Sequence, residues 1–391
     1  MSTNRETSPT FAVIAGGGTS GHIVPALAIA ELLVESGQRP ESLYFLGSDR
    51  GAEVALLANS PYPHSMLRVD GFQRSWHPRS LIRTAAMIPM MLRAVRSARE
   101  LLVSLRPNVV VSVGGYASIP AARAAHQLAI PVVTCSYDRR PGIATRLQSR
   151  YSVASAVAYM PSELNNAKLT GAPVRAVLRH LNRSASRSAA RSRLNIAEHR
   201  RLVVVMGGSL GSAVLNQTVR GIVELWVRRS DLAILHLSGT RYFTDEMPNV
   251  NLLSGSKDGQ IDYQRLAYCD NMADVYAAAD LIVSRAGASS VAEIATVGVP
   301  SILIPWKGAA ENHQRDNAQW LVGRGGAVLV DESDLSISTL TGVISDLLDH
   351  YEKLTQIGER AYELGLLHRE CSIAEVIVDA AYGATRGEIQ K

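Results

Sequence analysis

Residues 11–35 read FAVIAGGGTSGHIVPALAIAELLVE, an apolar run followed by a glycine-rich turn and a helix-like segment. The run FAVIA suits a buried strand, and LAIAELLVE suits a helix. Gly16, Gly18 and Gly21 fit the G-x-G-x-x-G pattern of dinucleotide-binding turns. His22 stands directly behind the last glycine, where a turn that cradles a pyrophosphate does not need an imidazole. The stretch therefore predicts a strand–turn–helix unit whose turn holds either a dinucleotide or a catalytic histidine.

Apolar, β-branched runs alternate with helix-like segments along the whole chain. Residues 201–212, RLVVVMGGSLGS, echo the layout of residues 11–22, FAVIAGGGTSGH. Such alternation is typical of βαβ units in a parallel sheet. The sequence therefore predicts an α/β fold with two Rossmann-like, doubly wound parallel-sheet domains. We interpret the polar passage 174–200 as a linker between a domain at 9–173 and a domain at 201–391 that ends in a final helix.

The composition favours a protein without membrane spans. Hydrophobic residues make up 47% of the 391 residues and aromatic residues 5%, which suits α/β layers. Three scattered cysteines without metal-ligand spacing suit a reducing cytoplasm. The start, MSTNRETSPT, lacks the apolar core of a signal peptide, and no apolar run outside the strands approaches the roughly 20 residues that span a bilayer. We expect a soluble or peripheral protein.

Arginine is unevenly distributed, although the formal net charge is only +5. Over residues 72–99, arginines alternate with bulky apolar side chains, which indicates either an interfacial segment for anionic lipid or an ordinary helix packed on the sheet. Pro89 is expected to kink any helix there. A second set of arginines recurs every four residues and predicts a solvated helix face. Aromatic residues do not interleave with the arginines as base stacking requires, so we expect no nucleic-acid partner. The second set consists of Arg175, Arg179, Arg183, Arg187 and Arg191.

The passage 284–295, SRAGASSVAEIA, places a helix start directly after a strand. Ligands of doubly wound sheets bind beyond the carboxyl ends of the strands, so the first amides of this helix could bind a diphosphate. Ser290 and Glu293 have the spacing of a capping box. Alternatively, Glu293 could accept hydrogen bonds from ribose hydroxyls, and both interpretations stay open.

Two more loops suit a nucleotide sugar. Residues 207–217, GGSLGSAVLNQ, offer Ser209 as a hydroxyl donor, and residues 309–318, AAENHQRDNA, are dense in amide and carboxylate groups that recognise sugar hydroxyls. The chain has no D-x-D pair, the common way of holding a metal against a nucleotide diphosphate. We therefore expect helix amides and Arg285 to neutralise the diphosphate.

Six motifs together resemble a known family. They are GGTSGHIVPALAIA, VGGYASIPAARAA, TGAPVR, MGGSLGSAVLNQ, SRAGASSVAEI and AAENHQRDNA, in that order. Their order and spacing are similar to those of the MurG family, peptidoglycan N-acetylglucosaminyltransferases of the GT-B fold, over residues 11–385. The resemblance implies inverting transfer from UDP-N-acetylglucosamine to the 4-hydroxyl of N-acetylmuramic acid in undecaprenyl-linked lipid I, forming lipid II. It also implies no cofactor, no metal in the catalytic step, and a peripheral place on the cytoplasmic side of the membrane.

The resemblance assigns residues to both substrates. Ala288, Ser289 and Ser290 would meet the donor's phosphate, and Glu293 its ribose. The other donor-side residues are Ser209, His313, Gln314 and Asn317. The expected acceptor-side and further substrate-binding residues are Gly17, Gly18, Thr19, Gly21, His22, Tyr116 and Arg175.

One segment departs from the family's pattern. Where the family usually carries His-Glu-x-Asn, this chain has Cys135, Ser136, Tyr137 and Asp138. The family's asparagine is associated with sugar binding, so a catalytically impaired homologue, acting as a nucleotide-sugar sensor or scaffold, stays an alternative. A UDP-N-acetylglucosamine 2-epimerase and a nicotinamide oxidoreductase are weaker alternatives. For the oxidoreductase, Asp49 stands too far beyond the glycine turn to serve as the usual ribose ligand.

His22 and Asp138 follow two strands of one predicted sheet, so we expect both at its carboxyl edge. An imidazole that titrates near neutrality suits the base that takes the proton of the attacking 4-hydroxyl. A nearby carboxylate would orient the ring and stabilise its protonated form. We therefore predict a His22–Asp138 catalytic dyad. The alternative is that His22 only hydrogen-bonds the acceptor's phosphate or its own loop.

Overall fold

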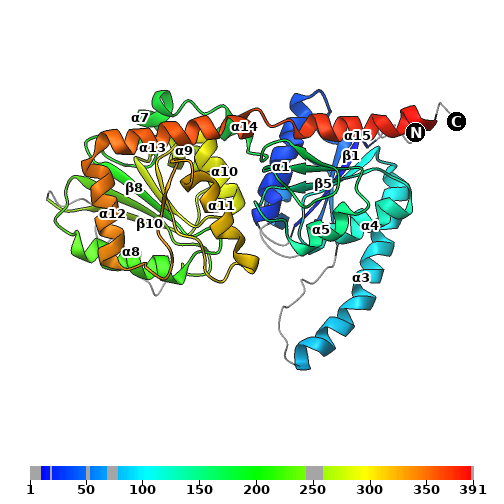
Figure 1. The fold of residues 1–391 in the computed structure, drawn as a ribbon, viewed down its shortest axis with the longest axis horizontal. Helices are drawn as coiled ribbons and strands as arrows, with labels where there is room; N and C mark the ends of the chain where they lie inside the picture. The colour runs from blue at the N-terminus through cyan, green and yellow to red at the C-terminus, as the bar shows by residue number, and fades with distance from the viewer. Residues whose placement is uncertain (1–9, 18–19, 50–52, 68–77, 244–258, 389–391) are drawn as a thin grey trace, which may run out of the picture. The chain divides into compact units, whose positions relative to one another are not determined.

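The computed structural model describes residues 10–17, 20–49, 53–67, 78–243 and 259–388, and the chain divides into two compact units. Unit 1 comprises residues 1–176 and 370–391, and unit 2 comprises residues 177–369. Each unit contains one parallel sheet covered by helices (Figure 1). The predicted fold class, two Rossmann-like domains with parallel sheets, is confirmed.

Unit 1 contains a seven-stranded sheet in the order β3-β2-β1-β4-β5-β6-β7. The interior strand β1 (Ala12–Ala15) is buried along its whole length, as expected for an apolar run with helices on both faces. The other strands are β2 (Leu43–Ser48), β3 (His64–Leu67), β4 (Val109–Ser112), β5 (Val132–Ser136), β6 (Ala154–Val157) and β7 (Ala167–Leu169). The helices are α1 (Ser20–Glu35), α2 (Glu53–Ala58), α3 (Pro78–Leu105), α4 (Ile119–Gln127), α5 (Ile143–Ser149) and α15 (Ile373–Glu388), with 3-10 turns η1 (Pro40–Ser42) and η2 (Tyr116–Ser118).

Unit 2 contains a six-stranded sheet in the order β10-β9-β8-β11-β12-β13. Its strands are β8 (Arg201–Met206), β9 (Leu232–Leu237), β10 (Asp262–Leu266), β11 (Leu281–Ser284), β12 (Ser301–Leu303) and β13 (Val328–Leu329). Its helices are α7 (Arg183–Arg193), α8 (Ala213–Leu225), α9 (Met272–Ala278), α10 (Ala288–Val297), α11 (His313–Val322), α12 (Ile337–Asp349), α13 (Tyr351–Leu364) and α14 (Leu366–Arg369), with 3-10 turn η3 (Ala310–Asn312). The short helix α6 (Ala176–Arg179) lies where the two units meet in sequence.

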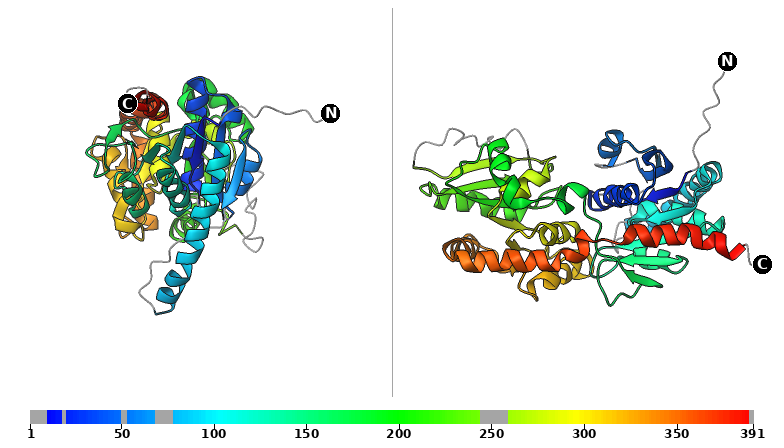
Figure 2. Two further views of the ribbon diagram at one scale, coloured as in Figure 1. Left: turned by 90° about the vertical axis from the view of Figure 1, so that its right-hand side faces the viewer. Right: turned by 90° about the horizontal axis from the view of Figure 1, so that it is seen from above.

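The final helix, α15, belongs to unit 1 rather than to the C-terminal domain, which corrects the predicted domain boundary. It packs against α1 and against β4, β5 and β6 (Figure 2). Ile373 and Ile377 are buried in this contact, and the ring of Tyr382 lies 6.0 Å from that of Phe11. The chain therefore returns to its first domain because α15 has an apolar face that the sheet of unit 1 buries.

The predicted linker is also more ordered than its composition indicated. Residues 183–193 form α7, which packs on α9 of unit 2. The prediction of a solvated arginine face is wrong here, because Arg191 is fully buried. Its Nη1 donates to the carbonyl oxygens of Ala197 and Arg200, at 3.0 and 2.9 Å. These arginines therefore stabilise the fold of unit 2.

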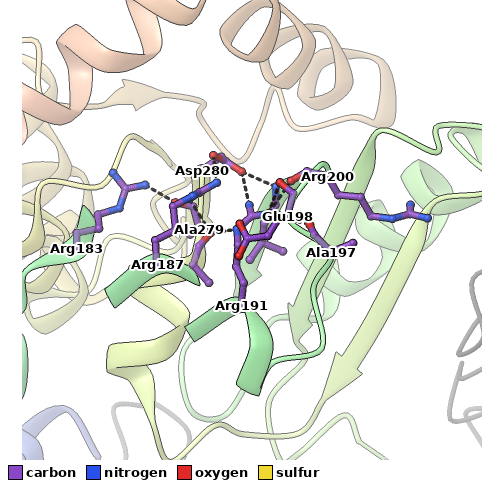
Figure 3. Close-up of polar contacts among 10 residues, drawn as sticks. Arg183, Arg187, Arg191, Ala197, Glu198, Arg200, Ala279 and Asp280 are labelled. Carbon is purple, nitrogen blue, oxygen red and sulfur yellow. Dashed lines mark hydrogen bonds and ion pairs between the residues drawn. The ribbon is translucent and has the colours of Figure 1, made fainter. Parts of the chain in front are cut away.

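Asp280, directly before β11, is the carboxylate at the centre of this contact (Figure 3). Its Oδ1 accepts from Arg187 at 2.7 Å, and its Oδ2 accepts from Arg191 at 2.8 Å. The backbone N–H of Leu202 in β8 also donates to Oδ2, at 2.7 Å. The side chain thus joins α7 to two neighbouring strands, at the end of the sheet where those strands begin.

Helix α3 covers only part of the arginine-rich segment 72–99, because residues 68–77, with Phe72, Arg74 and Trp76, lie outside the described residues. The C-terminal half of α3 buries Ala94, Ala98 and Leu102 in the core of unit 1, whereas Leu92 is 65% exposed. Figure 1 shows the N-terminal half extending away from the sheet. Among the described residues, we find no helix with the length and apolar character that crossing a bilayer requires.

Candidate active site

The carboxyl edge of the sheet in unit 1 brings His22 against the second glycine loop. His22 lies in the first turn of α1, and Gly114 and Gly115 follow β4 with positive φ angles of 90° and 74°. A Cβ on Gly115 would lie 3.2 Å from His22 Cε1 and 2.9 Å from the carbonyl oxygen of Gly17. Only glycine leaves room for the imidazole and accepts this backbone conformation. The two predicted acceptor loops therefore meet at His22.

Burial lowers the pKa of His22 below its ordinary value, and the carboxylate of Asp138 opposes that shift. Asp138 directly follows β5, at the same edge of the sheet. The balance keeps the ring neutral at pH 7, which is the form that accepts a proton. The expectation that His22 and Asp138 lie at one edge is met, and their catalytic roles stay predictions.

Tyr137 is a site residue that the sequence analysis did not assign. It is buried, and its hydroxyl donates to the carbonyl oxygens of Gly21 at 2.9 Å and Val113 at 3.2 Å. Burial and the neighbouring Asp138 hold the pKa of this phenol well above its usual value, so it remains a donor. Tyr137 therefore fixes the start of α1, which carries His22, to the end of β4. The sequence did indicate that this segment is unusual, because Tyr137 lies within residues 135–138, which depart from the family's pattern.

The remaining predicted residues of unit 1 differ in their surroundings. Gly18 and Thr19 lie outside the described residues, and Gly21 is in the first turn of α1. Tyr116 opens η2, next to Gly115. Arg175 donates from Nε to Oε1 of Glu31 in α1 at 2.7 Å. This ion pair anchors the end of unit 1 to α1, and a substrate contact of Arg175 stays a prediction.

In unit 2, α10 begins directly after the β11 turn, with Gly287 as its N-cap. Ala288, Ser289 and Ser290 form the first turn. The capping-box interpretation is therefore wrong, because Ser290 is the third residue inside the helix rather than its cap. Glycine has no side chain with which to cap the first amides. The helix dipole and these amides make an N-terminus suited to an anion.

Glu293, one turn further along α10, is held by a buried tyrosine. The hydroxyl of Tyr276, from α9, donates to Glu293 Oε2 at 2.8 Å, and Tyr276 is fully buried. Burial and the adjacent carboxylate raise the pKa of Tyr276 well above its usual value, so the phenol remains a donor. This hydrogen bond fixes the orientation of the Glu293 carboxylate, which suits the predicted contact with a ribose.

A cavity of about 380 Å³ lies beside the loop 207–214. The loop is tightly packed, because a Cβ on Gly211 would lie 2.0 Å from the carbonyl oxygen of Ser238. Ser209 and Gln314, both predicted donor-side residues, line the cavity. Arg285, which the sequence analysis expected near the diphosphate, also lines it. Sequence reasoning missed four other lining residues, which are Arg241, Tyr242, Trp306 and Glu332.

Arg285 is held by two side chains of unit 2. Its Nη2 donates to Glu332 at 2.6 Å and to the Ser212 hydroxyl at 2.7 Å, and the side chain is largely buried. Glu332 already balances its charge within the protein, and the role of Arg285 toward a diphosphate stays a prediction.

Helix α11 carries the other three predicted residues of unit 2. His313 is its first residue, after two residues in the left-handed region. Gln314 Oε1 accepts from the backbone N–H of Trp306 at 2.9 Å. Asn317 is fully buried and donates to the carbonyl oxygen of Ala286 at 3.3 Å. Gln314 and Asn317 thus support the loops after β12 and β11, and their contacts with a sugar stay predictions.

The chain matches known glycosyltransferases along most of its length. Residues 12–157 match the glycosyltransferase family 28 N-terminal domain, and residues 202–367 match the family 28 C-terminal domain. A UDP-N-acetylglucosamine–N-acetylmuramyl-(pentapeptide) pyrophosphoryl-undecaprenol N-acetylglucosamine transferase of Paenarthrobacter aurescens (strain TC1) is 34% identical over 374 residues, which cover 95% of this chain and 96% of the relative. The relative of the same name from Streptomyces coelicolor (strain ATCC BAA-471 / A3(2) / M145) is 31% identical, with coverage of 96% and 99%.

Solved structures share the fold. The crystal structure of Acinetobacter baumannii MurG has a TM-score of 0.68 and 24% identity, and the match covers 95% of this chain and 100% of that one. A UDP-GlcNAc 2-epimerase from Neisseria meningitidis, bound to UDP-GlcNAc, has a TM-score of 0.63 and 13% identity, with coverage of 95% and 99%. At these identities, the structural likeness shows the fold alone.

Proposed function

The chain belongs to the family of UDP-N-acetylglucosamine–N-acetylmuramyl-(pentapeptide) pyrophosphoryl-undecaprenol N-acetylglucosamine transferases, and from this membership we infer the same reaction for it. It transfers N-acetylglucosamine from UDP-N-acetylglucosamine to the 4-hydroxyl of the muramic sugar in lipid I, forming lipid II for peptidoglycan. The observation that carries this inference is 34% identity to a named relative over 95% of the chain.

In the proposed mechanism, the 4-hydroxyl oxygen of lipid I attacks the anomeric carbon as the bond to UDP breaks. His22 accepts the hydroxyl proton, and UDP leaves with the bonding electron pair. The N-terminus of α10 stabilises the charge that develops on the diphosphate, because its amides and dipole favour an anion. Attack from the face opposite the leaving group inverts the anomeric centre.

Incubating the purified protein with radiolabelled UDP-N-acetylglucosamine and a lipid I analogue tests the function directly. We expect labelled lipid II and free UDP. Donor binding without product would instead support the sensor or scaffold interpretation that the segment 135–138 raised. A reaction that yields only the 2-epimer of the sugar would favour the epimerase class.

Glu293→Gln is expected to weaken donor use mainly through binding. Losing a charge-assisted hydrogen bond to a ribose hydroxyl costs roughly 1.5–3 kcal/mol, or about 10- to 150-fold in donor KM. The melting temperature should change little, because the glutamine oxygen can still accept from Tyr276. Steady-state kinetics with varied donor measure the effect, and Glu224→Gln, an exposed change on α8, is the matched control. An unchanged donor KM would remove Glu293 from the donor site.

We also propose that the protein attaches peripherally to the cytoplasmic face of the membrane through the segment 72–99. The support is its mixture of arginines with apolar side chains, together with the exposure of Leu92 and Arg93 on α3. Such a segment combines burial of apolar area with attraction to anionic lipid.

Flotation with anionic liposomes should fall strongly when Arg79, Arg83 and Arg93 are all changed to glutamate. Each arginine near an anionic surface contributes about 1 kcal/mol, so the reversal of three charges has a large effect. The control carries the same change at the exposed residues Arg39, Arg228 and Arg324. Equal flotation of the two triple variants would remove this segment from membrane binding.

A further inference from the structure

Unit 2 contains a second, larger cavity, at the opposite end of its sheet from the loop 207–214. This groove, of about 1150 Å³, lies between α7 and α13 and runs past Asp280 and Pro300, the residues that precede β11 and β12. The predicted donor residues all follow the carboxyl ends of strands, whereas these residues stand at the amino ends. The groove is therefore separate from the candidate active site.

The α7 side of the groove is strongly cationic. Arg183 and Arg187 line it, and Arg191 lies behind them in the core. Arg187 and Arg191 both pair with the carboxylate of Asp280, which also attracts Arg183. On this wall the three guanidinium groups outnumber the carboxylate, in a partly desolvated place where charge interactions are stronger than in water.

Arg183 is the member of this cluster whose hydrogen-bonding capacity is least used. It donates from Nη2 to the carbonyl oxygen of Ala279 (Figure 3), and its buried Nε has no hydrogen-bond partner among the described residues. Burial, with repulsion from Arg187, lowers the pKa of Arg183 to about 10, so the group stays charged at pH 7. A buried donor without a partner is costly, and a bound anion would satisfy it.

We propose that this groove binds a phosphate monoester, with the phosphate against Arg183 and Arg187 at the α7 end. At pH 7 such a phosphate carries a charge of about −1.5 to −2, which is complementary to the cationic α7 wall. Arginine is well suited to it, because the planar guanidinium donates to phosphate oxygens in pairs.

The opposite wall limits how the ligand lies. Helix α13 contributes Tyr351 and the carboxylate of Glu359, and the guanidinium of Arg201 stands 5.5 Å from the centre of the Tyr351 ring. Glu359 repels an anion on its side, whereas the Tyr351 ring offers an apolar face to an organic substituent. The phosphate therefore belongs on the α7 wall, with the rest of the ligand toward α13.

Calorimetric titration of the full-length protein tests the proposal. Inorganic phosphate and phenyl phosphate serve as ligands at constant ionic strength set with chloride, and saturating UDP is present to occupy the proposed donor site. We expect saturable one-to-one binding that Arg183→Gln weakens at least tenfold. The matched control, Arg228→Gln, changes an exposed arginine of the same unit and should bind as the unchanged protein does.

A lysine variant and a comparison of the two ligands complete the experiment. Arg183→Lys keeps the charge but loses the paired geometry, so its affinity should lie between those of the unchanged protein and Arg183→Gln. The melting temperature without ligand shows whether each variant is folded.

The two ligands are compared next. Tighter binding of phenyl phosphate identifies a monoester, and equal affinities identify free phosphate as the ligand. No saturable binding, or equal binding by Arg183→Gln and Arg228→Gln, overturns the proposal. Donor KM should be unchanged in Arg183→Gln, so failure here is distinct from failure of the transferase function.

Discussion

His22→Ala is expected to lower kcat for transfer to lipid I by about 10²- to 10⁴-fold, the range that positioned general bases contribute. The donor KM should change little, because the predicted donor residues all belong to unit 2. The imidazole is packed against Gly114 and Gly115, and the methyl group of alanine in its place cannot accept a proton. Single-turnover kinetics with a lipid I analogue measure the loss, and His199→Ala, an exposed change in unit 2, is the control.

The pH profile tests the proposed role more sharply than the loss of rate. Burial lowers the pKa of His22 and Asp138 raises it, with burial the larger effect. The acid limb of kcat/KM should therefore lie below the ordinary histidine pKa of about 6.5. Asp138→Asn removes the opposing charge, so the limb should move to still lower pH while the maximal rate falls.

The double variant decides whether the two residues act together. Residues that work as a unit give non-additive losses, so His22→Ala with Asp138→Asn should be little slower than His22→Ala alone. Losses that multiply would show that Asp138 acts independently. A nearly fully active His22→Ala would remove histidine from the chemistry and leave it as a contact of its own loop.

The strand runs and glycine turns predict the two sheets well because they depend on local pattern. FAVIA and RLVVVM supply the interior strands β1 and β8, which are buried apart from Arg201, and the turns behind them stand at the carboxyl edges. Contacts between distant segments are harder to predict. The departure at 135–138 marked the segment as unusual, but not that the hydroxyl of Tyr137 would bond to Gly21, 116 residues away.

Two errors have the same physical origin. The spacing of Ser290 and Glu293 fits a capping box, but the N-cap is Gly287, so the helix starts three residues earlier than that box requires. The four-residue period of the arginines indicates one helix, but only Arg183, Arg187 and Arg191 share a helix, α7. The period also does not say which surface that helix meets. Helix α7 meets a surface that contains Asp280 and the carbonyl groups before β11. These groups accept hydrogen bonds from the arginines, so the arginine side of the helix is buried.

The same contact leads to the largest expected effect on stability. Asp280→Ala should lower the free energy of unfolding of unit 2 by about 3–5 kcal/mol, the usual consequence of removing one partner of a buried ion pair. Arg191 would lose its charge partner, because Asp280 is its only carboxylate partner among the described ion pairs. Water cannot replace that partner, because the side chain of Arg191 is fully buried. The backbone N–H of Leu202 also loses its contact with the carboxylate.

Asp231→Ala is the matched control, because Asp231 pairs with Arg229 on the surface, where side-chain exposures are 54% and 36%. An exposed pair contributes about 0.2–1 kcal/mol, so this variant should unfold almost as the unchanged protein does. Chemical denaturation followed by tryptophan fluorescence measures both, and Trp226 in the core of unit 2 reports on the relevant unit. Asp280→Asn keeps the shape and one acceptor oxygen but loses the charge, and should lie between them. If Asp280→Ala were no less stable than Asp231→Ala, the arginines of α7 would have to be satisfied by backbone carbonyls alone, and the cationic wall of the groove would not depend on Asp280.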